Sequence, residues 1–239
     1  QNTDEVESAL HALRQLAEMA PGNDAACGGL GNLYMYRQEP ERAMTPLQKA
    51  VSLAPKNTTY RADLSKCHRL LEDRTAAISA YKEILQIDNK NALAMGELGY
   101  LYETENPRES LSWFEKALAL EPENAFYHSA KAELLIQMPG QAASALESYN
   151  QACRYDPGNP DLHVKLGHLL EEQDNLASAV DHYKKAVSLR PEDPDTCYRL
   201  ARYTLDAHPD RAFLYIETAI RLSVTRGDYY YVKSRIIEA

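Results

Sequence analysis

The chain has 239 residues, of which 44% are hydrophobic and 26% charged, and its formal net charge is −9 with a pI near 5.3. Proteins that bind nucleic acid usually carry a basic patch or a high pI, so no nucleic-acid partner is expected. No apolar run approaches the ~20 residues that a membrane-spanning helix needs, so no membrane span is expected either.

A lone helix is predicted near the start of the chain, within residues 1–23. Ala9, Leu13, Leu16 and Pro21 follow one another at spacings of 4, 3 and 5, which second helices further along the chain repeat. We therefore expect a second helix whose own first helix is missing, with an N-terminal capping helix as the alternative. Because the chain opens with Gln1 and shows no signal-peptide pattern, we expect a region excised from a longer protein; a processed form is the alternative.

From residue 24 onward, a pair of short amphipathic helices recurs. In residues 160–193, Leu166, Leu169 and Leu170 have the i, i+3, i+4 spacing of a first helix. A small–aromatic–small stripe then predicts a second helix, and Pro191 ends it because proline has no N–H to donate.

Four columns of this pattern keep one register along the chain, at spacings of 33 to 35 residues. They are a small residue (Ala43, Ala77, Ser110, Ala145, Ala179, Ala212), a large one (Leu47, Tyr81, Phe114, Tyr149, Tyr183, Ile216), a second small position (Ala50, Ile84, Ala117, Ala152, Ala186, Ala219) and a terminator (Pro55, Asn89, Pro122, Pro157, Pro191, Val224). Six repeats follow: 24–57, 58–91, 92–124, 125–159, 160–193 and 194–224. Such arrays form one solenoid in which each repeat contacts its neighbours.

The columns resemble the tetratricopeptide repeat (TPR) family. The matching first-helix residues are Leu30-Gly31 with Tyr34, Leu98-Gly99 with Tyr102, and Leu166-Gly167; Ser65, Ala132 and Ala201 replace the glycine in repeats two, four and six. The resemblance implies an all-α fold, a right-handed superhelical solenoid of antiparallel helix pairs.

Residues 225–239 are predicted to form a C-terminal capping helix. Asp228 is a suitable N-cap, and repeat arrays need a terminal helix over their last apolar face. We expect Tyr229, Tyr230 and Tyr231 to include cap residues; an exposed aromatic patch used for dimerisation is the alternative.

No residue pattern indicates chemistry. Cys27, Cys67, Cys153 and Cys197 form no CxxC pair, so buried free thiols in a reducing compartment are expected. This favours the cytoplasm, with a periplasmic or membrane-associated assembly as the alternative. His168 and Glu172 have i, i+4 spacing, but no third metal ligand is evident and no HExxH, P-loop or GxSxG occurs. We expect no metal, no cofactor and no enzymatic activity.

By resemblance to the family, positions 2, 5, 9, 12 and 13 of each repeat face a concave groove. The candidate groove residues are Asn32, Met35, Tyr36, Lys66, Arg69, Tyr100, Glu103, Phe126, Glu133, His168, Glu171, Tyr198 and Arg202. Aromatic members are expected to anchor apolar side chains, Lys66 and Arg69 to form a basic spot, and Glu103, Glu133, Glu171 and Glu172 an acidic stretch. Gly28 is expected to leave room for a bound chain.

The expected function is a scaffold that binds a peptide or helical segment of a partner protein. A self-assembling, oligomeric module, or a targeting region of a larger enzyme or secretion machine, are the alternatives. Some TPR proteins grip the carboxyl end of chaperones with a set of lysines and asparagines. Asn32 matches one element of that set, but Gly28, Asp63, Leu93 and Gly96 do not, so an Hsp70 or Hsp90 tail is not expected as ligand.

Overall fold

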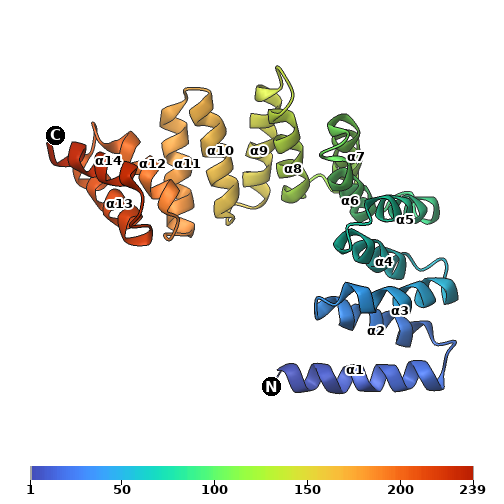
Figure 1. Ribbon diagram of the computed structural model, residues 1–239. Coiled ribbons are helices and arrows are strands. Elements are labelled where there is room, and N and C mark those ends of the chain that lie inside the picture. Colours follow the sequence, from blue (N-terminus) through green and yellow to red (C-terminus); the bar gives the residue numbers. More distant parts are fainter. Residues whose placement is uncertain (1, 239) are drawn as a thin grey trace. The chain divides into compact units, whose positions relative to one another are not determined.

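The structure, a computed structural model, describes residues 2–238, and all regular elements in this range are α-helices (Figure 1). The helices are α1 (Asn2–Met19), α2 (Asp24–Tyr36), α3 (Pro40–Leu53), α4 (Thr58–Leu70), α5 (Arg74–Ile87), α6 (Ala92–Tyr102), α7 (Pro107–Leu120), α8 (Ala125–Ile136), α9 (Ala142–Tyr155), α10 (Pro160–Glu172), α11 (Leu176–Leu189), α12 (Pro194–Thr204), α13 (Pro209–Leu222) and α14 (Gly227–Glu238). The predicted all-α class and helix pairing are confirmed. The first helices begin at residues 24, 58, 92, 125, 160 and 194, where the predicted repeats open.

Every first helix begins after an asparagine or aspartate whose side chain caps it. The side-chain oxygen accepts a hydrogen bond from a backbone N–H in the first turn, a group that otherwise has no partner within the helix. Asn91, for example, accepts from the N–H of Ala94 at 2.9 Å. The residues that cap in this way are Asn23, Asn57, Asn91, Asn124, Asn159 and Asp193.

The three packing columns of the second helices lie in the core, together with buried residues of the first helices. All eighteen residues in them are buried, none more than 2% exposed. Gly167 shows why a glycine suits the facing position, because a Cβ there would lie 2.5 Å from the Tyr183 ring. The register read from the sequence is therefore confirmed.

In three of the repeats, the residue at the same position of the turn between the two helices adopts the left-handed backbone conformation. Gln38, Glu72 and Asp174 have φ near +60° at position 15 of their repeats. In repeat four, Gly140 takes a positive φ of 76° in the slightly longer turn. Non-glycine residues seldom adopt this conformation, asparagine and aspartate less seldom than others, so the turns at Gln38 and Glu72 store some strain.

The helices group into two compact units, Gln1–Pro122 and Glu123–Ala239. Unit 1 contains α1 and the helix pairs of repeats one to three. Unit 2 contains the pairs of repeats four to six and α14. Within each unit, helices adjacent in sequence pack against one another. None of the helices in residues 2–238 combines the length and the hydropathy that a bilayer span requires.

Candidate partner-binding surface

The predicted groove residues of unit 1 lie on or next to its first helices, and none of them is buried. Tyr36, on α2, is 65% exposed, and Tyr100, on α6, is 39% exposed. Asn32 and Arg69 are exposed as well, while Met35, Lys66 and Glu103 are half-buried. Two further apolar side chains, Leu70 on α4 and Leu93 on α6, are about half exposed.

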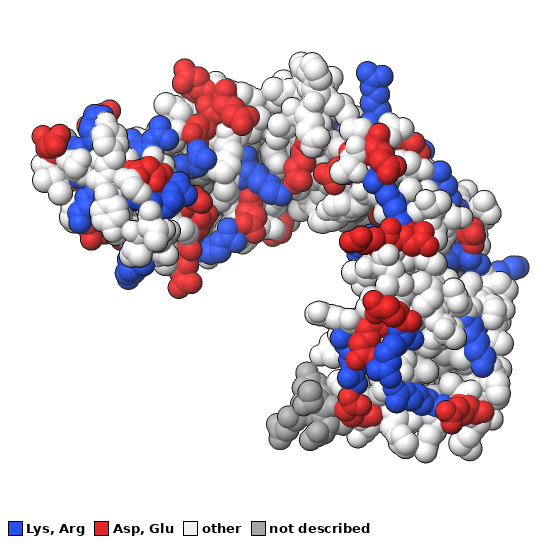
Figure 2. Space-filling model, viewed as in Figure 1, with Lys and Arg blue, Asp and Glu red and all other residues white. Residues whose placement is uncertain are grey.

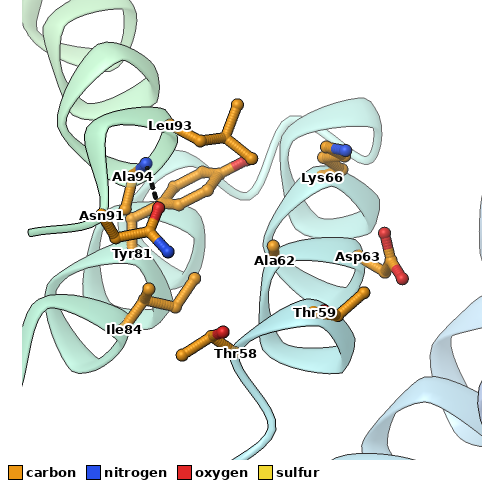
Figure 3. Close-up of a pocket in the computed structure, with 10 residues that line it drawn as sticks. All are labelled: Thr58, Thr59, Ala62, Asp63, Lys66, Tyr81, Ile84, Asn91, Leu93 and Ala94. Atoms are coloured by element: carbon orange, nitrogen blue, oxygen red, sulfur yellow. Dashed lines mark hydrogen bonds between the residues drawn. The ribbon is translucent and has the colours of Figure 1, made fainter. Parts of the chain in front are cut away.

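A pocket of about 140 Å³ lies between α4 and α6, and Tyr81 and Ile84 of α5 also line it (Figure 3). Figure 3 shows Leu93 and Ala94 on one side, Ala62 and Lys66 on the other, and the Tyr81 ring beside Leu93. The lining residues are Thr58, Thr59, Ala62, Asp63, Lys66, Tyr81, Ile84, Asn91, Leu93 and Ala94. The pocket is thus a depression of mixed polarity, with apolar side chains such as Leu93 and Ile84 and with one cation and one carboxylate on its α4 side.

Burial, together with the nearby carboxylate of Glu97, raises the pKa of Tyr81. The hydroxyl therefore stays protonated at any physiological pH. Sequence reasoning assigned Tyr81 to the core and placed Leu93 among the inward positions without singling it out. The sequence feature that could have identified Leu93 is a large apolar residue at position 2 of the repeat, on the exposed side of its helix.

The expectation for Gly28 is wrong. Gly28 is buried, and a Cβ there would overlap the ring of Tyr60 on α4. Ala62, Gly96 and Ser129, which hold the same position in repeats two to four, are also buried. In unit 1, close approach between α2 and α4 fills the space that was expected to accommodate a ligand.

The predicted basic spot is a mixed-charge site. The Arg69 guanidinium lies 3.6 Å from a carboxylate oxygen of Glu97, and Asp63 lies beside Lys66 in the pocket wall. On the face seen in Figure 2, blue and red side chains alternate over both units, with no large area of one sign. Cations and carboxylates are therefore interspersed around the Lys66 and Arg69 positions.

In unit 2, Glu171 is the acceptor of an internal network. It accepts from the Tyr183 hydroxyl at 2.6 Å and the Arg199 guanidinium at 2.6 Å, and also from the Tyr203 hydroxyl. Burial acts to raise the pKa of Glu171, but these donors and the charge of Arg199 outweigh it and lower the pKa. Burial and the same cation lower the pKa of His168, which is half-buried.

Glu133 also has partners within the chain. Lys165 lies 2.5 Å from it, and Ser129 donates a hydrogen bond at 3.2 Å. The cations Lys165 and Arg199 both hold position 6 of the next repeat, as Glu97 does opposite Arg69. Ion pairs between adjacent first helices therefore occupy much of the predicted acidic stretch, of which Glu172 stays exposed. Sequence reasoning missed this pairing, although position 6 of one repeat and position 9 or 12 of the preceding one carry opposite charges.

The remaining aromatic candidates lie at the two ends of unit 2. Phe126 on α8 is 51% exposed. Tyr198 on α12 is half-buried because Tyr229 of α14 packs on it, with ring centroids 4.9 Å apart, and Arg202 lies over the Tyr198 ring. Part of the Tyr198 side chain is therefore used in packing against the C-terminal helix α14.

α14 covers the end of unit 2 with Tyr229, Val232 and Ile236, all buried, while Tyr230 and Tyr231 are exposed. The prediction that the tyrosine run includes cap residues holds for Tyr229.

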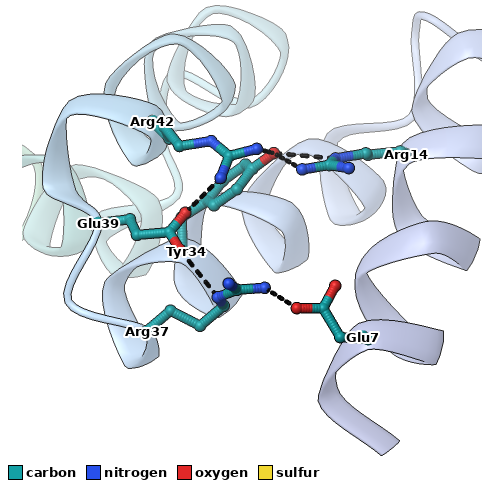
Figure 4. Close-up of polar contacts among 6 residues, drawn as sticks. All are labelled: Glu7, Arg14, Tyr34, Arg37, Glu39 and Arg42. Carbon is teal, nitrogen blue, oxygen red and sulfur yellow. Dashed lines mark hydrogen bonds and ion pairs between the residues drawn. The ribbon is translucent and has the colours of Figure 1, made fainter. Parts of the chain in front are cut away.

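Helix α1 packs on α2 with Leu10, which is 1% exposed, whereas Ala9 is exposed and Leu16 is 43% exposed. The exposure of Ala9 and Leu16 does not decide between a second helix and a capping helix, so both stay predictions. Polar contacts supplement this packing: Arg14 donates to the Tyr34 hydroxyl at 2.7 Å, and Arg37 pairs with Glu7 (Figure 4).

Comparison with known proteins supports the repeat assignment. Tetratricopeptide repeat profiles match residues 4–67, 140–174 and 160–193. The type IV pilus assembly protein PilF of Pseudomonas aeruginosa is 25% identical over 150 residues, which are 61% of this chain and 58% of that protein's length. The chain thus spans less than two thirds of that relative.

Solved structures show the same fold. A structure of Pseudomonas aeruginosa PilF superposes with a TM-score of 0.73 at 21% identity, covering 88% of this chain and 96% of the other. The C-terminal part of a TPR protein from Cytophaga hutchinsonii gives 0.77 at 13% identity, covering 97% and 95%. YrrB, described as a TPR protein with an unusual peptide-binding site, gives 0.63 at 18% identity, covering 79% and 97%. With its matched repeats, buried columns and solenoid relatives, this chain belongs to the tetratricopeptide repeat family.

Proposed function

We propose that the chain is a non-catalytic scaffold that binds an extended or helical segment of a partner protein on the first-helix surface of unit 1. The observation that carries the proposal is the pocket between α4 and α6, bordered by Leu93 and by the ammonium group of Lys66. TPR proteins serve in general as protein-interaction scaffolds, and YrrB is described as having a peptide-binding site.

The contacts define the class of ligand. An aliphatic or aromatic side chain of the partner would fill the pocket between Ala62, Ile84 and Leu93. A carboxylate one or two residues away would reach Lys66. Tyr100 and Leu70, both exposed, extend the apolar surface on the same two helices. Aromatic anchors in desolvated pockets typically weaken binding by ~2 kcal/mol or more when truncated.

The test is selection of random twelve-residue peptides on the intact chain, followed by titration of one selected peptide against variants. We expect selected peptides to share an apolar residue near an Asp or Glu. Tyr100→Ala and Leu93→Ser should weaken binding at all salt concentrations. Lys66→Ala should weaken it chiefly at low salt, because rim charges act mainly on the on-rate.

Lys49, an exposed lysine on the second helix α3, provides the matched control: Lys49→Ala should bind as the parent does. If Lys49→Ala abolishes binding while Lys66→Ala and Leu93→Ser do not, the ligand occupies the second helices and the proposal is wrong. The proposal is also wrong if the selected peptides share no apolar residue.

The likeness to PilF supports a second proposal about context, namely that the partner belongs to an assembly machine. A self-assembling module is the competing use of the exposed tyrosines of α14. The molar mass of the intact chain in solution separates them: a concentration-dependent dimer that Tyr231→Ser dissociates would favour self-assembly, and a monomer at high concentration would favour a different partner.

A further inference from the structure

Three side chains that commonly bind metals converge within unit 2, away from the first-helix surface of unit 1. They are Cys153 on α9, His163 on α10 and His182 on α11, and one ligand atom of each lies within 4.8 Å of the others. Cys153 and His163 are buried, and His182 is half-buried. Among residues 2–238, this is the one group of three or more cysteine, histidine or acidic side chains that meets this distance.

The orientation of His163 is fixed by the backbone. Its Nε2 lies 3.2 Å from the carbonyl oxygen of Pro157, which can only accept a hydrogen bond. Nε2 therefore carries the proton, and Nδ1 presents a lone pair toward the cluster. Metal-bound histidines usually donate their second ring N–H to a carbonyl or carboxylate in this way.

The lone pair of His163 faces another ring nitrogen. Nδ1 of His182 lies 3.1 Å from Nδ1 of His163, and the two rings are stacked with an interplanar angle of 28°. Two nitrogen ligands of a tetrahedral Zn²⁺, each at ~2.0–2.1 Å, would lie about 3.3 Å apart. The histidine pair therefore already has a separation suited to one shared ion.

Packing of the repeats does not require these three residue types. The equivalent positions of other repeats hold Val51, Arg61 and Ala80; Leu85, Met95 and Trp113; and Val187, Cys197 and Tyr215. Only the junction of α9, α10 and α11 has a ligand-type side chain at all three positions.

We propose that Cys153, His163 and His182 bind one borderline-soft divalent ion of the Zn²⁺ class. The thiolate sulfur and the two Nδ1 atoms supply three ligands, and a water molecule on the half-buried side of His182 supplies the fourth. Binding releases the thiol proton to solvent, and the proton of His182 Nδ1 moves by exchange with solvent to Nε2 of the same ring, so that both histidines bind as neutral imidazoles. Sulfur and imidazole ligands favour Zn²⁺ over Mg²⁺ or Ca²⁺, which prefer oxygen. The ion would tie three successive helices together at the junction of repeats four and five.

The experiment uses the intact, reduced chain and the metal alone. Titration with Co²⁺ should reach one ion per chain and develop a thiolate-to-cobalt charge-transfer band, and Zn²⁺ should displace Co²⁺ and raise the thermal midpoint. Cys153→Val should remove the band and weaken binding by more than the ~10–100-fold expected for loss of a residue that only orients a metal ligand. Valine occupies the same position in repeats one and five, which favours normal folding of this variant.

Cys197→Val is the matched control, because Cys197 is equally buried but has no histidine pair beside it. This variant should keep the stoichiometry and the band. His182→Ala, which copies Ala80 of repeat two, gives a second test and should weaken binding while the helical circular dichroism is unchanged. Failure of the parent chain to bind Co²⁺, or an unaltered band in Cys153→Val or His182→Ala, would overturn the proposal.

Discussion

Replacing Glu171 with alanine should destabilise unit 2 by about 2–4 kcal/mol. Its carboxylate is 19% exposed and accepts from two tyrosine hydroxyls and the Arg199 guanidinium. A hydrogen bond to a charged group contributes ~1.5–3 kcal/mol, and such contributions within one network do not add fully. The substitution also leaves the hydroxyl of fully buried Tyr183 without its acceptor, at ~1–3 kcal/mol, whereas Arg199, 31% exposed, can turn to water.

The assay is urea unfolding of the intact chain, combined with hydrogen exchange resolved by helix. Repeat arrays depart from two-state unfolding, so the helix-resolved rates are needed to locate the effect. Exchange should accelerate in α10 and α12 and stay unchanged in unit 1. Glu171→Gln, which keeps one acceptor oxygen, should have about half the effect.

Glu172, the next residue, is exposed and provides the control: Glu172→Ala should change the free energy of unfolding by less than ~0.5 kcal/mol. If Glu171→Ala, Glu172→Ala and the parent have the same free energy of unfolding, Glu171 has no internal stabilising role. It would then again be a candidate for the ligand-binding surface.

The same network predicts a pH dependence. The pKa of Glu171 is lower in the folded chain than its ordinary value of 4.5, so the folded state binds the proton more weakly than the unfolded state. Its contribution to stability is therefore fully present above pH 4.5 and is lost as the pH falls through the folded pKa. The difference in unfolding free energy between the parent and Glu171→Gln should shrink over that range. A constant difference down to pH 3 would contradict the assignment.

Three further outcomes follow from burial and backbone conformation. Ala179→Glu places an unpaired charge in a fully buried column and should lower the stability of unit 2 by more than ~3 kcal/mol, seen as loss of its melting transition in circular dichroism. Leu10→Ala should weaken the docking of α1 by ~2–5 kcal/mol and speed its hydrogen exchange, whereas exposed Leu16→Ala should not. Glu72→Gly should raise the urea midpoint by the equivalent of ~0.5–1 kcal/mol, because glycine relieves a positive φ at some entropic loss.

The fold could be predicted because its signal is repeated. A single Ala–aromatic–Ala stripe, such as that around Tyr183, occurs in many amphipathic helices. Six copies of the stripe in one register, the last ending at Val224, predict a single arrangement of helix pairs. The first-helix starts followed from the same register. The asparagine caps reinforce it, although the sequence argument did not use them.

The surface could be predicted only in part, because position along a helix does not specify what the neighbouring helix places opposite. Gly28 was assigned to the groove by its position, but Tyr60 fills that space. Glu171 was counted as a ligand carboxylate, but its donors Tyr203 and Arg199 come from the next repeat. The histidine and cysteine cluster was missed for the same reason, since its members lie 10 and 19 residues apart on three helices.

The caps of the first helices have a consequence for the order in which the chain acquires structure. Each repeat carries its own start signal, and five of the six are neutral asparagines, which need neither a particular pH nor low salt. Contacts within each unit join mainly helices adjacent in sequence, so no distant segment must arrive before a pair can close. Ordering can therefore begin at several repeats in parallel, and a lesion in one repeat should leave the others able to nucleate unaided.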